Sequence, residues 1–534
     1  MKTFLQPLQN LAEMEEIQKQ AKKNRGILEI SGCMESQKAH LMYGLSGLFP
    51  CHLVIAADEK SAKELYEDYR FYDKRVYYYP AKDLLFFQAD IHGNLLIRQR
   101  MQVIRALLER EDEITVVTSI DGCMDYLAPL EKIEKQLIHF RNDSTLDMDK
   151  LTAALVHMGY ERVGQVEMPG QFSIRGGIID IYSLTEENPW RIELWGDEID
   201  SIRSFDAQSQ RSLENLDDVT IYPAAEQPME KNGVSFLDYF KETETLFFLD
   251  ELNHLEENAK AVQEEFQQSC ENRKEKGEIS LSGDWMCTWE ELCHKINDRN
   301  CVAMSLLDPK KSNWKISGQF NITVKSMSSY QSSFELLVKD LKQYKKEGYQ
   351  IVLLSGSRTR AERLAKDLQE EGLNAFYGQD SDRILQPGEI MVAYGHARRG
   401  FEYPLVKFAV ITETDIFGKE QKKRKKKKKY SGNRIQDFAE LSIGDLVVHE
   451  KHGLGIYRGI EKVEVDRVVK DYIKIEYRGG SNLYILATQL DALQKYSGSS
   501  ENAKTPKLNK LGGQEWNKTK SRVKGAVREI AEDL

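Results

Sequence analysis

The stretch between residues 443 and 496 restricts the fold more tightly than any other part of the sequence. Apolar and polar residues alternate in four short runs separated by glycines and charged turns, namely Asp445–His449, Gly455–Gly459, Tyr472–Tyr477 and Leu483–Leu486. Such alternation buries one face of a strand and exposes the other. Five or so short strands of this kind can close on themselves and so remove their free edges. The pattern therefore predicts a small β-barrel, a type of module that more often holds another protein than performs catalysis.

Two other segments alternate between buried strands and amphipathic helices. In the first, strands are expected at Gly26–Ser31, Cys51–Ala56, Val76–Tyr79 and Ile114–Thr118, with helices at Gln37–Leu48, Ser61–Tyr72 and Asn94–Glu109. In the second, which begins near Ile322, strands are expected at Gln350–Ser355, Asn374–Tyr377, Ile390–Tyr394 and Phe408–Thr412, with helices at Ser329–Glu347 and Arg358–Gly372. This alternation predicts two parallel sheets covered on both faces.

Between the two segments, residues 136–221 change to an antiparallel pattern, with strands expected at Gly170–Tyr182, Trp190–Trp195 and Asp200–Phe205. The change indicates an inserted α+β lobe with one exposed sheet face. Because side chains alternate along a strand, Arg191 and Trp195 share one face, expected to be the outer one. With the nearby Arg175 they have the composition of an interface anchor. The alternative is a solvated face on which an arginine stacks on the tryptophan.

The turn at residues 32–39 has the position of a phosphate-binding loop, after a strand and at the start of a helix. Gly32 and Lys38 keep the spacing of the Walker A motif, but Gln37 replaces its second glycine and Ala39 its Ser/Thr. A side chain at position 37 obstructs the amides that would surround a phosphate, and Ala39 offers magnesium no ligand. We therefore expect no nucleotide, metal or other cofactor here, whether the turn is a decayed site or an unrelated one.

Composition and charge exclude several other classes. A net charge of -10 argues against a chain that mainly binds nucleic acid, and the block at Lys422–Lys429 is either a mobile linker or a grip on DNA phosphates. There is no run of about 18 apolar residues and no signal-peptide core, so a cytoplasmic location is expected. Seven scattered cysteines form no CxxC pair. Two groups, Cys287/Cys293/His294/Cys301 and His449/His452, could form metal sites, but buried thiols and packing or turn histidines are the favoured interpretation.

Residues 443–496 resemble the polymerase-interacting module of bacterial transcription-repair coupling factors, which is related to CarD-type regulators. The resemblance is carried by Gly444-Asp445, Val447-Val448-His449, His452-Gly453, Gly455, Tyr457, Gly459, Asp471-Tyr472, Tyr477 and Leu483-Tyr484. The first α/β segment is similar to UvrB in its layout and at Tyr79–Arg105, and the lobe is similar to domain 2 of UvrB and of the coupling factors.

The resemblance implies a multidomain α/β chain. Its expected parts are a UvrB-like α/β module at 1–135 and 222–320, an inserted UvrA-binding lobe at 136–221, a small α/β domain at 321–418, a basic linker at 419–440, a CarD/Tudor-like barrel at 441–497, and a loop with the start of a helix at 498–534. Gly513–Leu534 reads as a helix without a stop signal, so a truncated chain is expected.

The implied function is that of a recruiting and regulatory part, without enzyme activity of its own. It would bind UvrA through Arg175, Arg191 and Trp195, where the family usually has phenylalanine at the last position. It would bind the RNA polymerase β subunit through an exposed edge at Arg458–Val465, with Arg458, Ile460 and Val463 as contacts. Double-stranded DNA, ATP and Mg would belong to a translocase motor outside this sequence. The alternatives are a UvrB-like helicase and a stand-alone CarD-like regulator. Arg191→Glu is expected to abolish UvrA binding at an unchanged melting temperature.

Overall fold

The computed structural model describes most of the chain, in two compact units that are treated separately below. The described residues are all except 24, 83–93, 111–112, 143, 227–232, 276–285, 308–313, 379–381, 419–432, 435–440, 450–451, 466–467, 479–480, 487–492, 497–506 and 510–534. The first unit comprises residues 1–82, 102–134 and 227–423, and the second comprises residues 83–101, 135–226 and 424–534.

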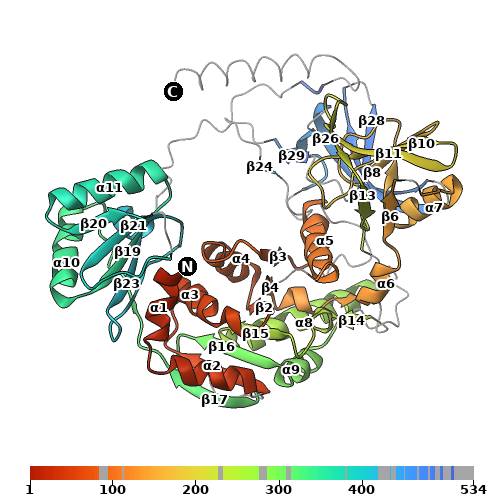
Figure 1. Cartoon of the computed structure of the whole chain (residues 1–534). Helices are drawn as coiled ribbons and strands as arrows, with labels where there is room; N and C mark the ends of the chain where they lie inside the picture. Colours follow the sequence, from red (N-terminus) through yellow and green to blue (C-terminus); the bar gives the residue numbers. More distant parts are fainter. Residues whose placement is uncertain are drawn as a thin grey trace. The chain divides into compact units, whose positions relative to one another are not determined.

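The first sheet of the first unit is parallel and seven-stranded (Figure 1). Its order is β17 (Ile316–Asn321), β1 (Gly26–Ser31), β16 (Asn300–Ser305), β15 (Thr245–Asp250), β2 (Cys51–Ala56), β4 (Ile114–Ser119) and β3 (Val76–Tyr79). The central strands are buried along almost their whole length, as expected for a sheet covered on both faces. Three strands, β15, β16 and β17, come from the region after residue 222, where no strands were predicted.

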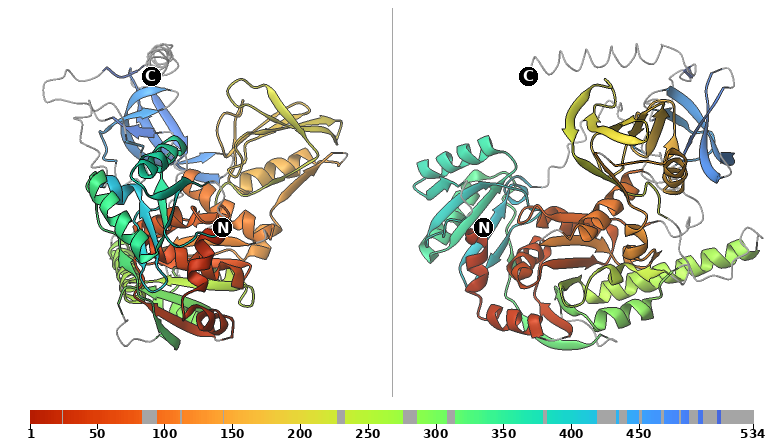
Figure 2. Two further views of the ribbon diagram at one scale, coloured as in Figure 1. Left: turned by 60° about the vertical axis from the view of Figure 1, so that its left-hand side comes forward. Right: turned by 45° about the vertical axis from the view of Figure 1, so that its right-hand side comes forward.

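The helices that accompany this sheet are α1 (Lys2–Gln9), α2 (Met14–Lys23), α3 (Glu35–Leu45), α4 (Glu59–Tyr69), α8 (Leu252–Glu275) and α9 (Trp289–Asn297), together with α5 (Asn94–Leu108), which both units share. Figure 2 shows the length of α8, which has 24 residues. Short elements complete the region: β5 (Tyr126–Leu127), α6 (Leu130–Glu134) and β14 (Val234–Ser235). The expected strands and helices are confirmed to within a few residues at their ends.

The second sheet of the first unit has the order β18 (Lys325–Ser326), β22 (Phe401–Tyr403), β23 (Phe408–Thr412), β19 (Gln350–Ser355), β21 (Glu389–Tyr394) and β20 (Asn374–Tyr377). The last four strands are parallel, and β18 and β22 are antiparallel additions that the sequence did not predict. Its helices are α10 (Phe334–Glu347), α11 (Arg358–Glu370) and α12 (Glu413–Phe417). Helix α10 starts later than expected because Ser333 caps it, accepting a hydrogen bond from the Leu336 amide.

One hydrophobic core runs from the first sheet to the second, and His40 lies fully buried within it. Its Nε2 lies 2.8 Å from the Phe4 carbonyl oxygen and its Nδ1 lies 3.1 Å from the Tyr403 hydroxyl. Burial lowers the pKa of His40 to about 4, which keeps the ring neutral at physiological pH.

The first unit should therefore lose stability as the pH falls from about 6.5 to about 4, because the unfolded chain takes up a proton on His40 in that range and the folded chain does not. The contribution is at most about 3 kcal/mol. Urea denaturation at several pH values gives the free energy of unfolding as a function of pH. The slope of this dependence should be smaller by about one proton in His40→Gln. His254→Gln, at an exposed histidine, is the matched control and should keep the slope. Equal slopes in all three proteins would contradict the prediction.

In the second unit, residues 138–221 form a six-stranded sheet, a two-stranded sheet and one helix. The larger sheet has the order β12 (Ser212–Leu216), β11 (Glu198–Phe205), β10 (Trp190–Trp195), β9 (Ile178–Ile181), β8 (Gln171–Arg175) and β7 (Glu161–Arg162). The smaller pairs β6 (Ile138–Arg141) with β13 (Asp218–Ile221), and the helix is α7 (Met148–His157).

The prediction of a single strand at Gly170–Tyr182 is wrong. These residues form a hairpin, in which Arg175 at the end of β8 pairs with Ile178 at the start of β9. Gly176 has a φ of +61°, which a residue with a side chain rarely adopts, and Gly177 completes the two-residue turn. The hairpin sets the register between Arg175 and the strands that follow.

The C-terminal part of the second unit is one antiparallel sheet. Its order is β24 (Asn433–Arg434), β29 (Leu493–Lys495), β25 (Leu446–His449), β26 (Gly453–Val465), β27 (Val468–Glu476) and β28 (Asn482–Leu486). The four runs expected to be strands are confirmed, and β24 and β29 were not predicted. The buried residues Val447, Ile473, Ile475 and Tyr477 form its core. Among the described residues no pairing joins β24 to β28, so closure into a barrel stays a prediction.

Candidate functional site

The turn between β1 and α3 uses its backbone amides on the protein itself. The Gly32 amide donates to the Leu306 carbonyl at 3.3 Å, and the Cys33 amide to the Ser305 carbonyl at 3.0 Å. The Met34 amide donates to Oε1 of Gln37 at 3.1 Å. A phosphate-binding loop needs such amides directed at the ligand. These three amides therefore leave no comparable cradle for a phosphate.

The side chain of Lys38 is also paired with groups of the protein itself. Its Nζ lies 2.6 Å from Oδ1 of Asp250 and 2.6 Å from Oε1 of Glu251, and the side chain is buried. Burial lowers the pKa of Lys38, but the two carboxylates outweigh it and raise the pKa above its ordinary value. Gln37 is fully buried and donates from Nε2 to the Tyr403 hydroxyl at 3.0 Å. Ala39 is fully buried, and its methyl group offers magnesium no oxygen ligand.

A cavity of about 700 Å³ beside this turn is bordered by two arginines from the loop between β21 and β22. Arg398 donates from its amide and from Nε to the Asp68 carboxylate, at 2.9 and 3.0 Å, and also pairs with Glu64. Arg399 donates its amide to the Ser36 hydroxyl at 3.1 Å. The loop therefore ties the second sheet to α3 and α4, and its two adjacent arginines were the sequence signal for this role.

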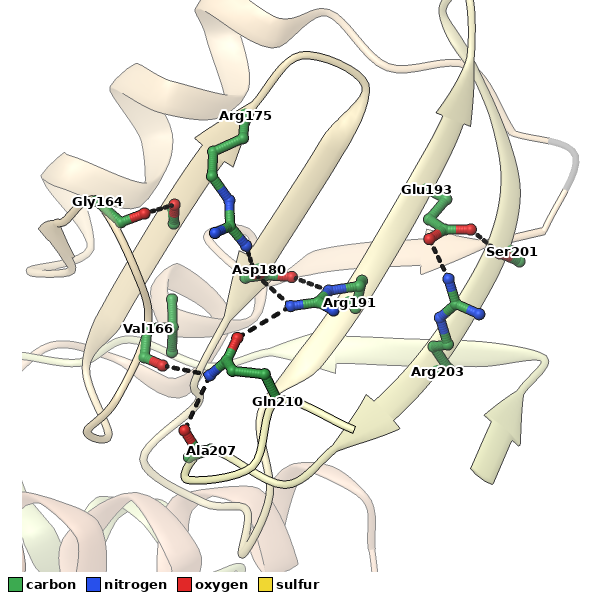
Figure 3. A network of polar contacts seen from close by, with 11 residues as sticks. Gly164, Val166, Arg175, Asp180, Arg191, Glu193, Ser201, Arg203, Ala207 and Gln210 are labelled. Carbon is green, nitrogen blue, oxygen red and sulfur yellow. Dashed lines mark hydrogen bonds and ion pairs between the residues drawn. The ribbon is translucent and has the colours of Figure 1, made fainter. Parts of the chain in front are cut away.

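In the lobe, a fully buried carboxylate joins two of the three predicted UvrA-binding residues (Figure 3). Arg191 donates from Nε and Nη2 to the two oxygens of Asp180, at 2.7 and 2.9 Å. Arg175 donates from Nη2 to Asp180 at 2.6 Å. Arg191 also contacts Gln210 and lies 4.5 Å from the ring centre of Phe205. Asp180 was missed, although an acidic residue within an apolar strand is a visible signal.

The three predicted residues differ in accessibility. The side chain of Arg191 is only 16% exposed, so the expectation that it is freely available on the outer face is wrong. Its long side chain bends to the buried carboxylate on the neighbouring strand, where Arg191 and Asp180 pair directly. Trp195 lies at the end of β10 and is 84% exposed. The alternative was an arginine stacked on the tryptophan, but Arg191 lies over the ring of Phe205 instead.

Arg191→Glu should destabilise the chain by about 3–5 kcal/mol, because the new carboxylate would face the buried Asp180 and remove its bidentate partner. This replaces the expectation of an unchanged melting temperature. Urea denaturation measures the effect. Arg211→Glu makes the same charge change at an exposed position of the same lobe and should cost less than about 1 kcal/mol. An equally stable Arg191→Glu protein would show that the ion pair contributes nothing.

The predicted polymerase contacts lie on β26. The side chain of Arg458 is 41% exposed and pairs with Glu476 at 2.7 Å. Ile460 packs partly against the core of the sheet, which limits its availability as an anchor. Val463 pairs with Lys470 of β27, and its side chain lies outside the described part. Strand β25 pairs only with Gly453–Ile456. Tyr457 still exchanges backbone hydrogen bonds with Gly444 and Asp445, and among the described residues Arg458–Val465 have a neighbouring strand on the β27 side alone.

The histidines and cysteines weighed as metal ligands have other contacts. The His452 amide donates to Nδ1 of the buried His449 at 3.3 Å, which places both in a turn. Cys287, Cys293 and Cys301 are buried free thiols. The residues that the structure describes contain no group of three or more potential metal ligands. None of the described helices is long and apolar enough to cross a bilayer. Lys422–Lys429 and Gly513–Leu534 lie outside the described residues, as does part of Tyr79–Arg105.

Comparison with known proteins assigns both regions of the second unit. The family model described as the UvrB interaction domain matches residues 138–226, and the CarD-like/TRCF RID domain matches residues 441–497. The transcription-repair-coupling factor of Bacillus subtilis (strain 168) is 32% identical over 581 residues, covering 95% of this chain and 49% of that protein. The chain belongs to the transcription-repair coupling factors. Those of Staphylococcus haemolyticus (strain JCSC1435) and Staphylococcus aureus (strain MRSA252) are 30% and 29% identical, over 86% of this chain and 44% of each protein.

The chain thus spans about half the length of the transcription-repair coupling factors that it matches. The resemblance seen in the sequence is confirmed, and so is the general class of a mixed α/β protein with a parallel sheet, a UvrB interaction domain and a CarD-like domain. Neither a UvrB-like helicase nor a stand-alone CarD-like regulator is favoured.

Proposed function

We propose that this chain is the recruiting and regulatory part of a transcription-repair coupling factor, which binds stalled RNA polymerase and brings UvrA to it. The observation that carries the proposal is the presence of both interaction domains, at 138–226 and 441–497, in one chain related to coupling factors over 95% of its length. A chain with two docking domains can bridge two partners.

The proposed domain layout is the one expected from the sequence: a UvrB-like module at 1–135 and 222–320, a lobe at 136–221, a small α/β domain at 321–418, a linker at 419–440, and a CarD/Tudor-like barrel at 441–497. Its main support is the pairing of β15 with β2 and of β16 with β1, which joins residues on both sides of the lobe into one sheet. An inserted lobe leaves such a pairing intact.

For the lobe we propose a division of roles within the UvrA-binding surface. Trp195 is the anchor, since it combines a large apolar ring with high exposure. Arg175 has a side chain that is 46% exposed and can contact the partner directly. Arg191 holds the surface in shape through Asp180 rather than acting as a free contact.

For the C-terminal sheet we propose that the β subunit of RNA polymerase adds a strand to β26 beyond Tyr457. The support is the edge left by the short β25, because an unpaired edge offers amides and carbonyls to an incoming strand. Arg458, Ile460 and Val463 remain the proposed contacts along this edge.

Arg458→Glu should weaken binding to the polymerase β subunit by roughly tenfold, because it reverses an exposed charge beside the proposed edge. Its melting temperature should change little, since an exposed ion pair contributes about 1 kcal/mol or less. Biolayer interferometry with the purified β subunit checks this. Arg478→Glu changes the same charge at an exposed position just after β27, beside the part of β26 that β25 covers, and serves as control. Equal affinity of wild type and Arg458→Glu would contradict the placement.

We further propose that residues 32–39 bind no nucleotide and that the chain has no catalytic activity of its own. ATP, Mg and double-stranded DNA would be the substrates and partners of a translocase in the longer protein, acting in the cytoplasm. The occupied amides and the paired Lys38 support the first point. A photoreactive ATP analogue with Mg should crosslink to no residue of 32–39, and a saturable crosslink within this turn would contradict the first point.

The experiment that tests the proposed function is a pair of pull-downs, one with UvrA and one with the polymerase β subunit. Both partners should be retained by the chain. Trp195→Ala should lose UvrA alone and Arg458→Glu should lose polymerase alone. If the chain retains neither partner, the proposal is overturned. If it retains UvrA alone, the proposal is restricted to the lobe.

A further inference from the structure

A second cavity in the first unit, of about 1000 Å³, lies where the second sheet meets the end of α4. Three adjacent parallel strands, β19, β21 and β20, end at its border, and each is followed there by a glycine: Gly356, Gly395 and Gly378. In open α/β sheets, ligands bind in the crevice outside the carboxyl ends of the strands. The volume is that of a small-molecule site.

The charge in this cavity is largely uncompensated. Its border carries the cations Arg70, Lys74 and Arg358 and one carboxylate, Glu67. Among the described residues, none of these three cations forms an ion pair with a carboxylate. In the cavity beside the β1–α3 turn, by contrast, Lys38, Arg398 and Arg399 all pair with carboxylates. An anion would therefore find free partners in the second cavity and few in the first.

Aromatic side chains border the same cavity. Tyr394 is 55% exposed, and the guanidinium of Arg358 lies 5.6 Å from its ring centre. Tyr377 and Phe71 are half-buried at the border. A Cβ at Gly395 would clash with the ring of Phe71, so any larger residue would require that ring to move. Stacking on an exposed ring beside a guanidinium is how proteins hold nucleobases without reading their identity.

We propose that this cavity binds a nucleotide, with its phosphates on Arg70, Lys74 and Arg358 and its base on Tyr394. The ligand is either a free nucleotide or a nucleotide within single-stranded DNA, since both present the same phosphate and base. The site is separate from residues 32–39 and needs neither UvrA nor polymerase. The proposal concerns binding alone.

Fluorescence anisotropy with two probes tests the proposal: a fluorescent ADP analogue and a fluorescein-labelled dT12 oligonucleotide. At least one should bind saturably, and the tighter of the two identifies the source. Arg358→Glu, and separately the pair Arg70→Glu and Lys74→Glu, should weaken binding by roughly tenfold or more. Tyr394→Ala should weaken the nucleotide but leave competition by inorganic pyrophosphate unchanged, which separates base stacking from phosphate binding.

Two matched controls make the same charge change elsewhere. Arg363→Glu lies on α11 outside the cavity, and Lys60→Glu borders only the other cavity. Both should bind as the wild type does. The proposal is overturned if neither probe binds at millimolar concentration, if Arg363→Glu loses as much affinity as Arg358→Glu, or if Lys60→Glu does so. Pyrophosphate competing as strongly as ADP would also overturn it, since the base would then contribute nothing.

Discussion

Trp195→Ala should weaken UvrA binding by about thirtyfold or more while the melting temperature of the chain stays unchanged. An anchor tryptophan at an interface contributes about 2 kcal/mol or more, which corresponds to this factor. Trp195 is 84% exposed, so its removal leaves no cavity in the lobe. Biolayer interferometry against purified UvrA gives the affinity, and thermal unfolding gives the stability.

Two variants calibrate this prediction. Trp195→Phe should retain most of the affinity, because phenylalanine keeps a large aromatic ring at this exposed position. Leu213→Ala removes another exposed apolar side chain, from β12 of the same sheet, and should bind UvrA normally. If Trp195→Ala binds as tightly as wild type, or if Leu213→Ala loses equal affinity, Trp195 is not the anchor.

Lys38→Ala should lower the free energy of unfolding by about 3–5 kcal/mol, because it leaves the buried Asp250 and its neighbour Glu251 without their shared cation. In a working phosphate-binding loop the lysine faces the ligand, and its loss mainly removes nucleotide affinity. Here the expected loss is in stability. Urea denaturation measures it at neutral pH.

Lys60→Ala is the control for this prediction, since Lys60 borders the same cavity and is exposed. It should cost less than about 0.5 kcal/mol. Adding Asp250→Asn to Lys38→Ala should recover part of the stability by removing the uncompensated charge. If Lys38→Ala lowers the free energy of unfolding by less than about 1 kcal/mol, the ion pairs of Lys38 do not have the structural role expected here.

The sequence predicted best those strands that are buried on both faces, because their burial requires an uninterrupted run of apolar residues. Strands such as β1 and β4 are buried at every residue, and an uninterrupted apolar run allows few other structures. The hairpin at Gly176-Gly177 was missed because apolar residues continue on both sides of it. The two glycines were the signal, since a two-residue turn with positive φ favours glycine.

The candidate sites were harder to predict, because they depend on contacts between strands and between sheets. Alternation places Arg191 and Trp195 on one face of β10, which says nothing of Asp180 on the neighbouring strand. That contact depends on the register set by the hairpin. The pairing of Arg398 with Asp68 joins residues 330 positions apart, and no local pattern reports it.

We propose that one chain connects polymerase to UvrA, and a bridging measurement can test this. The polymerase β subunit is immobilised, the chain is added, and UvrA is then passed over the surface. We predict that UvrA accumulates only when the chain is present, that Trp195→Ala removes UvrA but not the chain, and that Arg458→Glu reduces capture of the chain itself. If the surface captures the chain but no UvrA, at concentrations where the chain and UvrA bind each other in solution, the bridging role is contradicted.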